Sequence, residues 1–251
     1  MSPAGGNMYT DFAYCYDRLM KDVDYGRWAD YVEELFRLHG LKPSLMLDLG
    51  CGTGSFCLEM SGRGYDMIGI DLSADMLACA KAKAVEQGKD ILFLNQDMTD
   101  FELYGTVDAI VCLIDSINYI TYKKDLKRLF KLARNYLNPG GLFIFDINSE
   151  YKLEEVLGSN VYQRVEEDIA YIWQNSYDRA HRLCRFDLTI FAGRGRSCAR
   201  FDEIHYERAY STEEMEKLIA DSGLRLCSVF GELSTRKPGK KCERIFFVSE
   251  K

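Results

Sequence analysis

The stretch LMLDLGCGTG, residues 45–54, decides the fold of this chain, because three closely spaced glycines follow directly on an apolar run. In an open sheet of parallel strands, ligands bind at the carboxyl ends of the strands, where the first strand turns into its helix. Gly50, Gly52 and Gly54 occupy that place. Without side chains, they permit a tight turn and let a ligand lie against the backbone at the start of a helix. The stretch therefore predicts a ligand-binding loop.

The spacing of the glycines narrows the choice of ligand. A dinucleotide-binding loop follows G-x-G-x-x-G, and its third glycine would fall at position 55, which is Ser55. A P-loop ends in Gly-Lys-Ser or Gly-Lys-Thr, which this stretch lacks. The pattern G-x-G-x-G favours a ligand without a pyrophosphate group. We expect Asp48, just before the glycines, to orient the loop through backbone N–H groups.

Short apolar runs alternate with amphipathic segments on both sides of this loop, starting with a helical pattern at 25–38. Five apolar runs precede residue 150, at 44–50, 66–71, 91–97, 107–115 and 141–148. Such alternation indicates parallel strands joined by helical crossovers. A helix capped by Ser211 or Thr212 and two final strands, 224–232 and 243–251, complete the pattern. The predicted fold class is α/β, with a doubly wound, seven-stranded, mostly parallel sheet.

Between the fifth strand and the last helix the pattern changes to period two. Segments 165–178, 181–193 and 197–210 alternate apolar and polar residues and are separated by the turn-like stretches DRAH and GRGR. We predict an inserted antiparallel β-subdomain here, a cap over the substrate. The domains we expect are a helical lid at 1–42, a core at 43–150 and 211–251, and the insertion at 151–210.

Composition excludes several classes of function. The net charge of -7 and pI near 5.2 argue against nucleic acid or an anionic membrane as a partner. No apolar run approaches the roughly 20 residues of a spanning helix, and the N-terminal stretch lacks a secretory signal, so we expect a cytoplasmic protein. The nine cysteines lie mostly in apolar runs without a C-x-x-C pair, and the three histidines are dispersed. We therefore predict reduced thiols and no metal.

Two acidic residues at strand ends extend the ligand pattern. Asp71, in GIDLSADML, stands where a carboxylate accepts the hydroxyls of a ribose. Asp97, in NQDMTDF, ends the third strand beside a turn suited to an adenine edge. Together with the glycine spacing, they indicate a nucleoside with a free ribose and a polar arm that is not a phosphate.

In these motifs the chain resembles the class I S-adenosylmethionine-dependent methyltransferases. The family's glycine, ribose, adenine and strand-five motifs appear in order as LDLGCGTG, GIDLSADML, QDMTDF and LNPGGLFIFDIN. The resemblance implies S-adenosyl-L-methionine as cofactor and S-adenosyl-L-homocysteine as product, without a metal. It also implies a cofactor site made of Asp48, Gly50, Cys51, Gly52, Gly54, Asp71, Leu72, Met76, Asp97, Met98 and Leu113.

The N-terminal residues 8–32 resemble the helical lid of small-molecule members, such as glycine N-methyltransferase and the aminosugar N-methyltransferases. In those proteins aromatic residues close over the amino acid end of the cofactor, and Tyr9 and Tyr16, with Trp28 behind them, match these residues best. The alternative is that the three aromatic residues form the packing face of a helix. The predicted antiparallel insertion also resembles the insertion of this group of proteins.

Methyl transfer places few demands on catalytic side chains, because it is an in-line displacement at a carbon already activated by a sulfonium. His205 is our candidate general base, since it shares a strand face with Glu203 and Glu207. A structural role for this histidine is the alternative. Tyr119 is a candidate for the aromatic lining around the transferred methyl group, and Asp115 either anchors a cationic acceptor or caps its loop.

The predicted function is methyl transfer from S-adenosylmethionine to nitrogen or oxygen of a small-molecule acceptor. A nicotinamide-dependent oxidoreductase of Rossmann type shares the fold and the ribose acid, but the glycine spacing disfavours it. A non-catalytic S-adenosylmethionine-binding protein is a second alternative. A nucleic-acid methyltransferase is disfavoured because the sequence has neither a basic stripe nor an Asn-Pro-Pro-Tyr motif. The sequence leaves the acceptor and the oligomeric state open.

Overall fold

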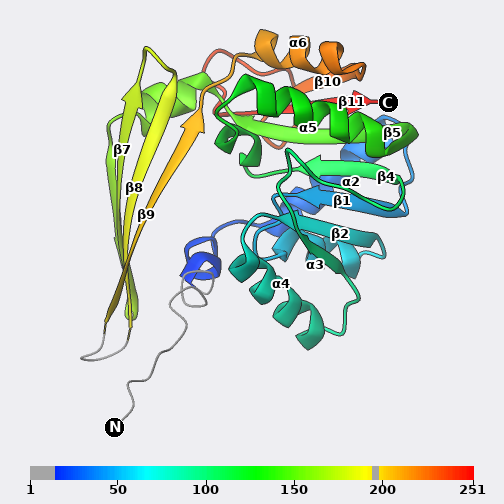
Figure 1. The fold of residues 1–251 in the computed structure, drawn as a ribbon. Coiled ribbons are helices and arrows are strands. Elements are labelled where there is room, and N and C mark those ends of the chain that lie inside the picture. Colours follow the sequence, from blue (N-terminus) through cyan, green and yellow to red (C-terminus); the bar gives the residue numbers. More distant parts are fainter. Residues whose placement is uncertain (1–14, 194–197) are drawn as a thin grey trace.

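A computed structural model of the chain describes residues 15–193 and 198–251. Within these residues, a seven-stranded sheet with the strand order β10-β11-β5-β4-β1-β2-β3 forms the centre of the molecule (Figure 1). Its strands are β1 Leu45–Leu49, β2 Asp66–Asp71, β3 Leu92–Asn95, β4 Val107–Cys112, β5 Leu137–Asn148, β10 Arg225–Gly231 and β11 Arg244–Glu250. Within the described residues, β11 alone runs opposite to the other strands of this sheet: it pairs antiparallel with β10 and β5, and the other pairs are parallel. The predicted mostly parallel sheet is therefore confirmed.

Helices cover both faces of this sheet, as the alternating pattern predicts. They are α2 Tyr25–Leu38, α3 Ser55–Gly62, α4 Ala74–Glu86, α5 Lys123–Tyr136 and α6 Thr212–Ser222. The helices α2, α3 and α4 pack on one face, and α5 and α6 pack on the other. Because each strand of the centre is apolar on both faces, it is buried between two helix layers. The sheet is thus doubly wound.

Local signals fix the ends of several helices. Ser211 caps α6 by accepting a hydrogen bond from the backbone N–H of Glu214, whose carboxylate in turn accepts from the N–H of Ser211. This capping box confirms the first of the two predicted caps. Gly223 ends the same helix in a left-handed conformation, at φ 83°.

The insertion is a separate antiparallel sheet with the order β6-β7-β8-β9 in the part that the structure describes. Its strands are β6 Val161–Val165, β7 Ile169–Asp178, β8 Leu183–Ala192 and β9 Ala199–Arg208, preceded by a π-helical turn, η2, at Lys152–Leu157. The prediction of an insertion is confirmed, but the prediction of one strand over 165–178 is wrong. Glu166 N–H donates to the carbonyl of Ile169 at 2.8 Å, and this turn separates β6 from β7. The three consecutive acidic residues Glu166, Glu167 and Asp168 break the alternation at this turn and are the sequence signal for it.

The insertion stands beside the edge of the main sheet at which the parallel strands end (Figure 1). Asn118 attaches the insertion to this edge. It lies in the short 3-10 helix η1, Ser116–Tyr119, which follows β4. The buried amide of Asn118 donates to the carbonyls of Asn148, at 3.1 Å, and Arg208, at 3.0 Å. The ends of β4, β5 and β9 are therefore held together by one side chain.

Residues 15–22, which we call the N-terminal strap, connect the far end of the insertion to the core. Arg18 pairs with Asp168 at 2.5 Å, and apolar strap residues pack on the inner face of the insertion. Asp17 pairs with Lys83 of α4 at 2.8 Å and accepts a hydrogen bond from Thr53 in the glycine loop. Helix α2, which follows the strap, packs instead within the core.

We expect Phe247→Ala to lower the free energy of unfolding by about 3 to 5 kcal/mol, the usual cost of truncating a buried aromatic side chain. Phe247 is fully buried and stacks on Phe145, with ring centroids 5.0 Å apart and an interplanar angle of 10°. Urea denaturation measures the effect. The control, Val85→Ala on the exposed face of α4, should change stability by less than about 0.5 kcal/mol. Equal losses in the two variants would contradict the packing described.

Candidate active site

The glycine loop between β1 and α3 combines close packing with one open position. Gly50, Gly52 and Gly54 have φ values of 74°, 54° and 73°, in the left-handed region that favours glycine. A Cβ atom at Gly50 would lie 2.9 Å from the hydroxyl of Ser116, and one at Gly54 would lie 2.8 Å from the Cβ of Ala80. A Cβ at Gly52 would meet no described atom within 4 Å. The loop therefore leaves room for a ligand at its middle glycine.

Asp71, at the end of β2, holds this loop in shape. One carboxylate oxygen accepts the N–H of Gly52 at 2.8 Å, and the other accepts the N–H of Ser73 at 2.8 Å. Burial raises the pKa of Asp71, although these amides act in the opposite direction. Asp71 thus ties the glycine loop to the turn that enters α4, and it lies at the strand end where the ribose role was predicted.

The expectation that Asp48 orients the loop through backbone N–H groups is wrong. Its buried carboxylate lies in the core and accepts from the thiol of Cys57 at 3.3 Å. Burial raises the pKa of Asp48 to about 7. The N–H groups of Gly50 and Cys51 donate to the carbonyl of Ile70, at 2.8 and 3.0 Å, and that of Gly52 donates to Asp71.

The other predicted adenine-side residues lie at the ends of β2 and β3. Leu72 is 73% exposed, although it is a large apolar side chain, and Met76 is half-buried in the first turn of α4. Asp97 accepts both the N–H and the hydroxyl of Thr99, at 2.7 and 2.8 Å. Met98 lies against the first glycine of the loop. These residues line one edge of the sheet, and their contacts with cofactor stay predictions.

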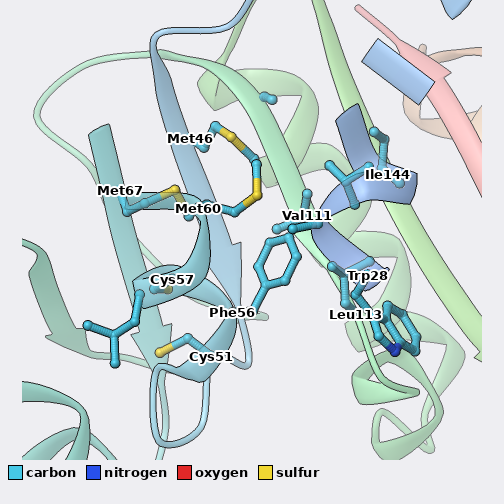
Figure 2. Close-up of a cluster of buried hydrophobic side chains, with 14 of the residues drawn as sticks. Trp28, Met46, Cys51, Phe56, Cys57, Met60, Met67, Val111, Leu113 and Ile144 are labelled. Carbon is cyan, nitrogen blue, oxygen red and sulfur yellow. The ribbon is translucent and has the colours of Figure 1, made fainter. Parts of the chain in front are cut away.

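Cys51, Leu113 and Trp28 belong to a buried apolar cluster next to the loop (Figure 2). The ring of Trp28 lies 5.5 Å from the ring of Phe246 and 5.3 Å from the guanidinium carbon of Arg244. This packing favours the alternative role of Trp28 as part of the face of a core helix. Tyr9 lies outside the described residues.

Tyr16, in the N-terminal strap, is the predicted aromatic residue that approaches the strand ends. Burial raises the pKa of its hydroxyl strongly, and Tyr25, Asp115 and Asp71 add to the effect. The two carboxylates follow β4 and end β2, respectively, so the strap carries Tyr16 across the carboxyl edge of the sheet.

The two predicted catalytic residues lie side by side. The ring centroids of Tyr119, in η1, and His205, on β9, are 5.8 Å apart with the rings nearly perpendicular. Burial lowers the pKa of His205, and the carboxylate of Glu203, 4.0 Å away, opposes this shift. The imidazole is therefore mainly neutral at pH 7. Burial of the Tyr119 hydroxyl, followed by the carboxyls of Glu207 and Asp115, raises its pKa, so this phenol stays protonated.

A buried polar network surrounds this pair, and most of it was missed by the sequence analysis. Glu207 is 2% exposed and accepts from the amide of Asn148 at 2.8 Å. Lys152 donates to the other side of that amide at 2.9 Å. Burial, with Asp115 adding to it, raises the pKa of Glu207 well above its usual range. The carboxyl is therefore held neutral over more of the pH range than an exposed glutamate.

Asp115 is engaged by a residue from the far end of the chain. Arg244 of β11 pairs with Asp115 at 2.6 Å and also with Asp146 of β5. The ion pair already engages the carboxylate that would anchor a cationic acceptor, and the Asp115 side chain makes no capping hydrogen bond at the start of η1. A signal for one of the missed residues exists in the sequence, because Asp146 interrupts the apolar run FIFDIN, whereas Arg244 stands at the start of its run, RIFFV. A charge in such a run must be paired if the strand is buried.

In residues 15–193 and 198–251, no cluster of three or more His, Cys, Asp or Glu side chains is arranged to hold a metal ion. Over the same residues, every helix is too short or too polar to cross a membrane.

Known proteins resemble this chain in sequence and in fold. The family model described as a methyltransferase domain matches residues 46–141. The chain is 35% identical to the putative methyltransferase YqeM of Bacillus subtilis (strain 168), over 97% of both chains. It is 24% identical to the dTDP-3-amino-3,4,6-trideoxy-alpha-D-glucopyranose N,N-dimethyltransferase of Streptomyces venezuelae, over 86% of this chain and 91% of that one.

A solved structure gives the same result. The crystal structure of an S-adenosylmethionine-dependent methyltransferase from Clostridium acetobutylicum ATCC 824 is 36% identical. It matches 97% of this chain and 99% of its own, with a TM-score of 0.89. The four motifs, the strand-end site and these full-length similarities agree, and the chain belongs to the S-adenosylmethionine-dependent methyltransferases.

Proposed function

We propose that the protein transfers the methyl group of S-adenosylmethionine, by in-line displacement, to a nitrogen or oxygen atom of a small molecule. The observation that carries this proposal is the open position at Gly52 beside the carboxylate of Asp71, at the edge of the sheet where η1 brings Tyr119 against His205. When bound, the cofactor supplies a methyl group already activated by a positively charged sulfur. The protein then has to position the acceptor and exclude water.

The residues at the strand ends suit this cofactor. The open backbone at Gly52 accommodates a ligand without steric conflict, and the carboxylate of Asp71 retains lone pairs for ribose hydroxyls. Leu72 offers an exposed apolar surface to a flat base, next to Met76 and the turn at 97–98. Because β4 lies on the other side of β1 from β2 and β3, the methionine arm would extend towards Leu113.

His205 is proposed to take the proton that an amine or hydroxyl acceptor loses. Its lowered pKa keeps the imidazole neutral, which a general base requires. Tyr119 forms the wall beside it and presents an uncharged aromatic surface. The positive charge on sulfur disappears during transfer, so an uncharged lining hinders the reaction less than a carboxylate would.

The domain roles follow from the contacts between segments. We propose that the N-terminal strap, within the predicted lid 1–42, covers the strand ends between the core and the insertion, because it is anchored to both. The insertion at 151–210 then acts as the cap over the acceptor. The core, 43–150 and 211–251, holds the cofactor.

A small-molecule acceptor in the cytoplasm is the substrate class we favour. The net charge of -7 suits neither nucleic acid nor an anionic membrane. The Streptomyces relative named above acts on an aminosugar, according to its name, and it covers most of this chain. A nitrogen acceptor is therefore the first class to screen.

We expect Asp71→Ala to weaken binding of S-adenosylmethionine and S-adenosylhomocysteine at least about tenfold, because a hydrogen bond to a charged group contributes about 1.5 to 3 kcal/mol. Isothermal titration calorimetry measures both ligands, with NAD as the negative control. The matched variant is Asp66→Ala, since Asp66 is exposed at the opposite end of the same strand. Binding of NAD by the wild type, without binding of the sulfur ligands, would overturn the cofactor assignment.

We expect the variants Gly52→Ala and Gly54→Ala to differ in kind. Gly54→Ala should lower stability more, because its Cβ would collide with Ala80 and Phe93 as well as requiring a positive φ. Gly52→Ala should fold but lose cofactor affinity, since its methyl group would occupy the open position. Urea denaturation and calorimetry on the same samples separate the two effects. Equal cofactor affinity in Gly52→Ala and the wild type would place the ligand elsewhere.

We expect His205→Asn to lower kcat about 100-fold or more, within the usual range for a general base. In the wild type, kcat/KM should rise with pH through a pKa below 6.5, because protonation of His205 removes the base. The variant should lose that limb of the profile. The assay measures S-adenosylhomocysteine release with a panel of amines and alcohols, and Tyr119→Phe serves as the conservative neighbour. An unchanged pH profile in His205→Asn would assign the histidine a structural role.

A further inference from the structure

The loop that follows β4 has an unusual backbone. Ile114 and Asp115 are consecutive residues with φ values of 55°, in the left-handed region. This conformation is uncommon for any residue other than glycine and is especially unfavourable for a β-branched side chain such as isoleucine. Surrounding contacts must therefore impose it.

Those contacts come from β5 and β11. The fully buried carboxylate of Asp146 accepts the N–H of Ile114 at 2.7 Å and the N–H of Asp115 at 3.0 Å. Arg244 pairs with Asp146 through one terminal nitrogen and with Asp115, at 2.6 Å, through the other. Each of the two strained residues is thus held through its backbone, and the second is held through its side chain as well.

Arg244 is itself fixed in position. Its guanidinium carbon lies 5.3 Å from the centre of the Trp28 ring, and its side chain is 17% exposed. Only a planar guanidinium presents two nitrogens at the separation needed to bridge two carboxylates while lying on an aromatic face. A lysine at this position would keep the charge but lose the bridge.

The shape of this loop bears on the proposed cofactor site. A Cβ atom at Gly50 would lie only 2.9 Å from the hydroxyl of Ser116, the residue after Asp115. The loop therefore packs directly on the first glycine. The sheet order places β4 across β1 from the ribose and adenine strands. A nucleoside held at β2 and β3 would therefore extend its remaining arm towards residues 113–116.

We propose that Arg244, Asp146 and Asp115 form a clamp that sets the loop after β4 in the shape that receives the amino acid arm of the cofactor. Arg244 is a positioning residue in this proposal, because it acts through the two aspartates. The proposal rests on the proposed function, since it assumes that S-adenosylmethionine binds at these strand ends.

The test compares Arg244→Lys with wild type by calorimetry, using S-adenosylhomocysteine and 5′-methylthioadenosine, which lacks the amino acid arm. We expect Arg244→Lys to weaken binding of S-adenosylhomocysteine about tenfold to 100-fold, as small displacements in a site do. Binding of 5′-methylthioadenosine should change less than about threefold, because the ribose and adenine strands are untouched. Asp146→Asn keeps only one oxygen to accept the N–H groups of Ile114 and Asp115, so it should show the same selective loss.

Arg63→Lys is the matched control, since Arg63 also bridges several carboxylates, Asp30, Glu33 and Glu59, but at the distant end of α3. It should lose stability without selective loss of either ligand. Equal weakening of both ligands in Arg244→Lys, or no weakening of either, would overturn the clamp. If the wild type binds neither ligand, the proposed function fails, and that result is distinct from either outcome in the variant.

Discussion

The site depends on the carboxylate of Asp71, because it joins the two turns that a ligand would occupy. It accepts the N–H of Gly52 from the loop after β1 and the N–H of Ser73 at the start of α4. Both amides are polar groups that would otherwise need water, so one side chain satisfies donors from two segments. Burial raises its pKa, and the two hydrogen bonds oppose that change by favouring the charged form. The middle glycine can then face open space without the loop losing its shape.

Around this loop, the strand ends are stiffened by buried polar groups with defined partners. Asn118 binds the carbonyls of Asn148 and Arg208, and Asn148 binds Glu207, so the insertion is fixed to the core at one corner. At the other end of the insertion, the N-terminal strap reaches the core through Asp17. A buried network of this kind specifies one arrangement, because leaving any member unpaired is costly. The insertion is thus held at both ends.

The sequence predicted those features that depend on short-range patterns. The strand and helix order, the glycine loop and the cap at Ser211 all follow from residues a few positions apart. The contact between Tyr119 and His205 could also be predicted from the sequence, because strand ends converge and period two fixes the inward face of β9. The role given to Asp48 failed because the choice between two neighbouring acids depends on their burial in the fold. The clamp joins residues 115, 146 and 244, which lie far apart in the sequence, so no local sequence pattern could predict their contact.

Electrostatics links the buried network to the proposed chemistry. Methyl transfer removes a positive charge from sulfur, so a free carboxylate nearby would stabilise the starting state more than the transition state. Asp115 lies in the loop after β4, but its carboxylate is paired with Arg244, which also pairs with Asp146. The raised pKa of Glu207 favours its neutral form, and the lowered pKa of His205 does the same for the imidazole. Because Tyr119 is also uncharged, this wall presents three ionisable side chains that favour their neutral forms, with the carboxylate of Glu203 beside His205 at 4.0 Å. Such a wall suits a reaction in which charge is lost.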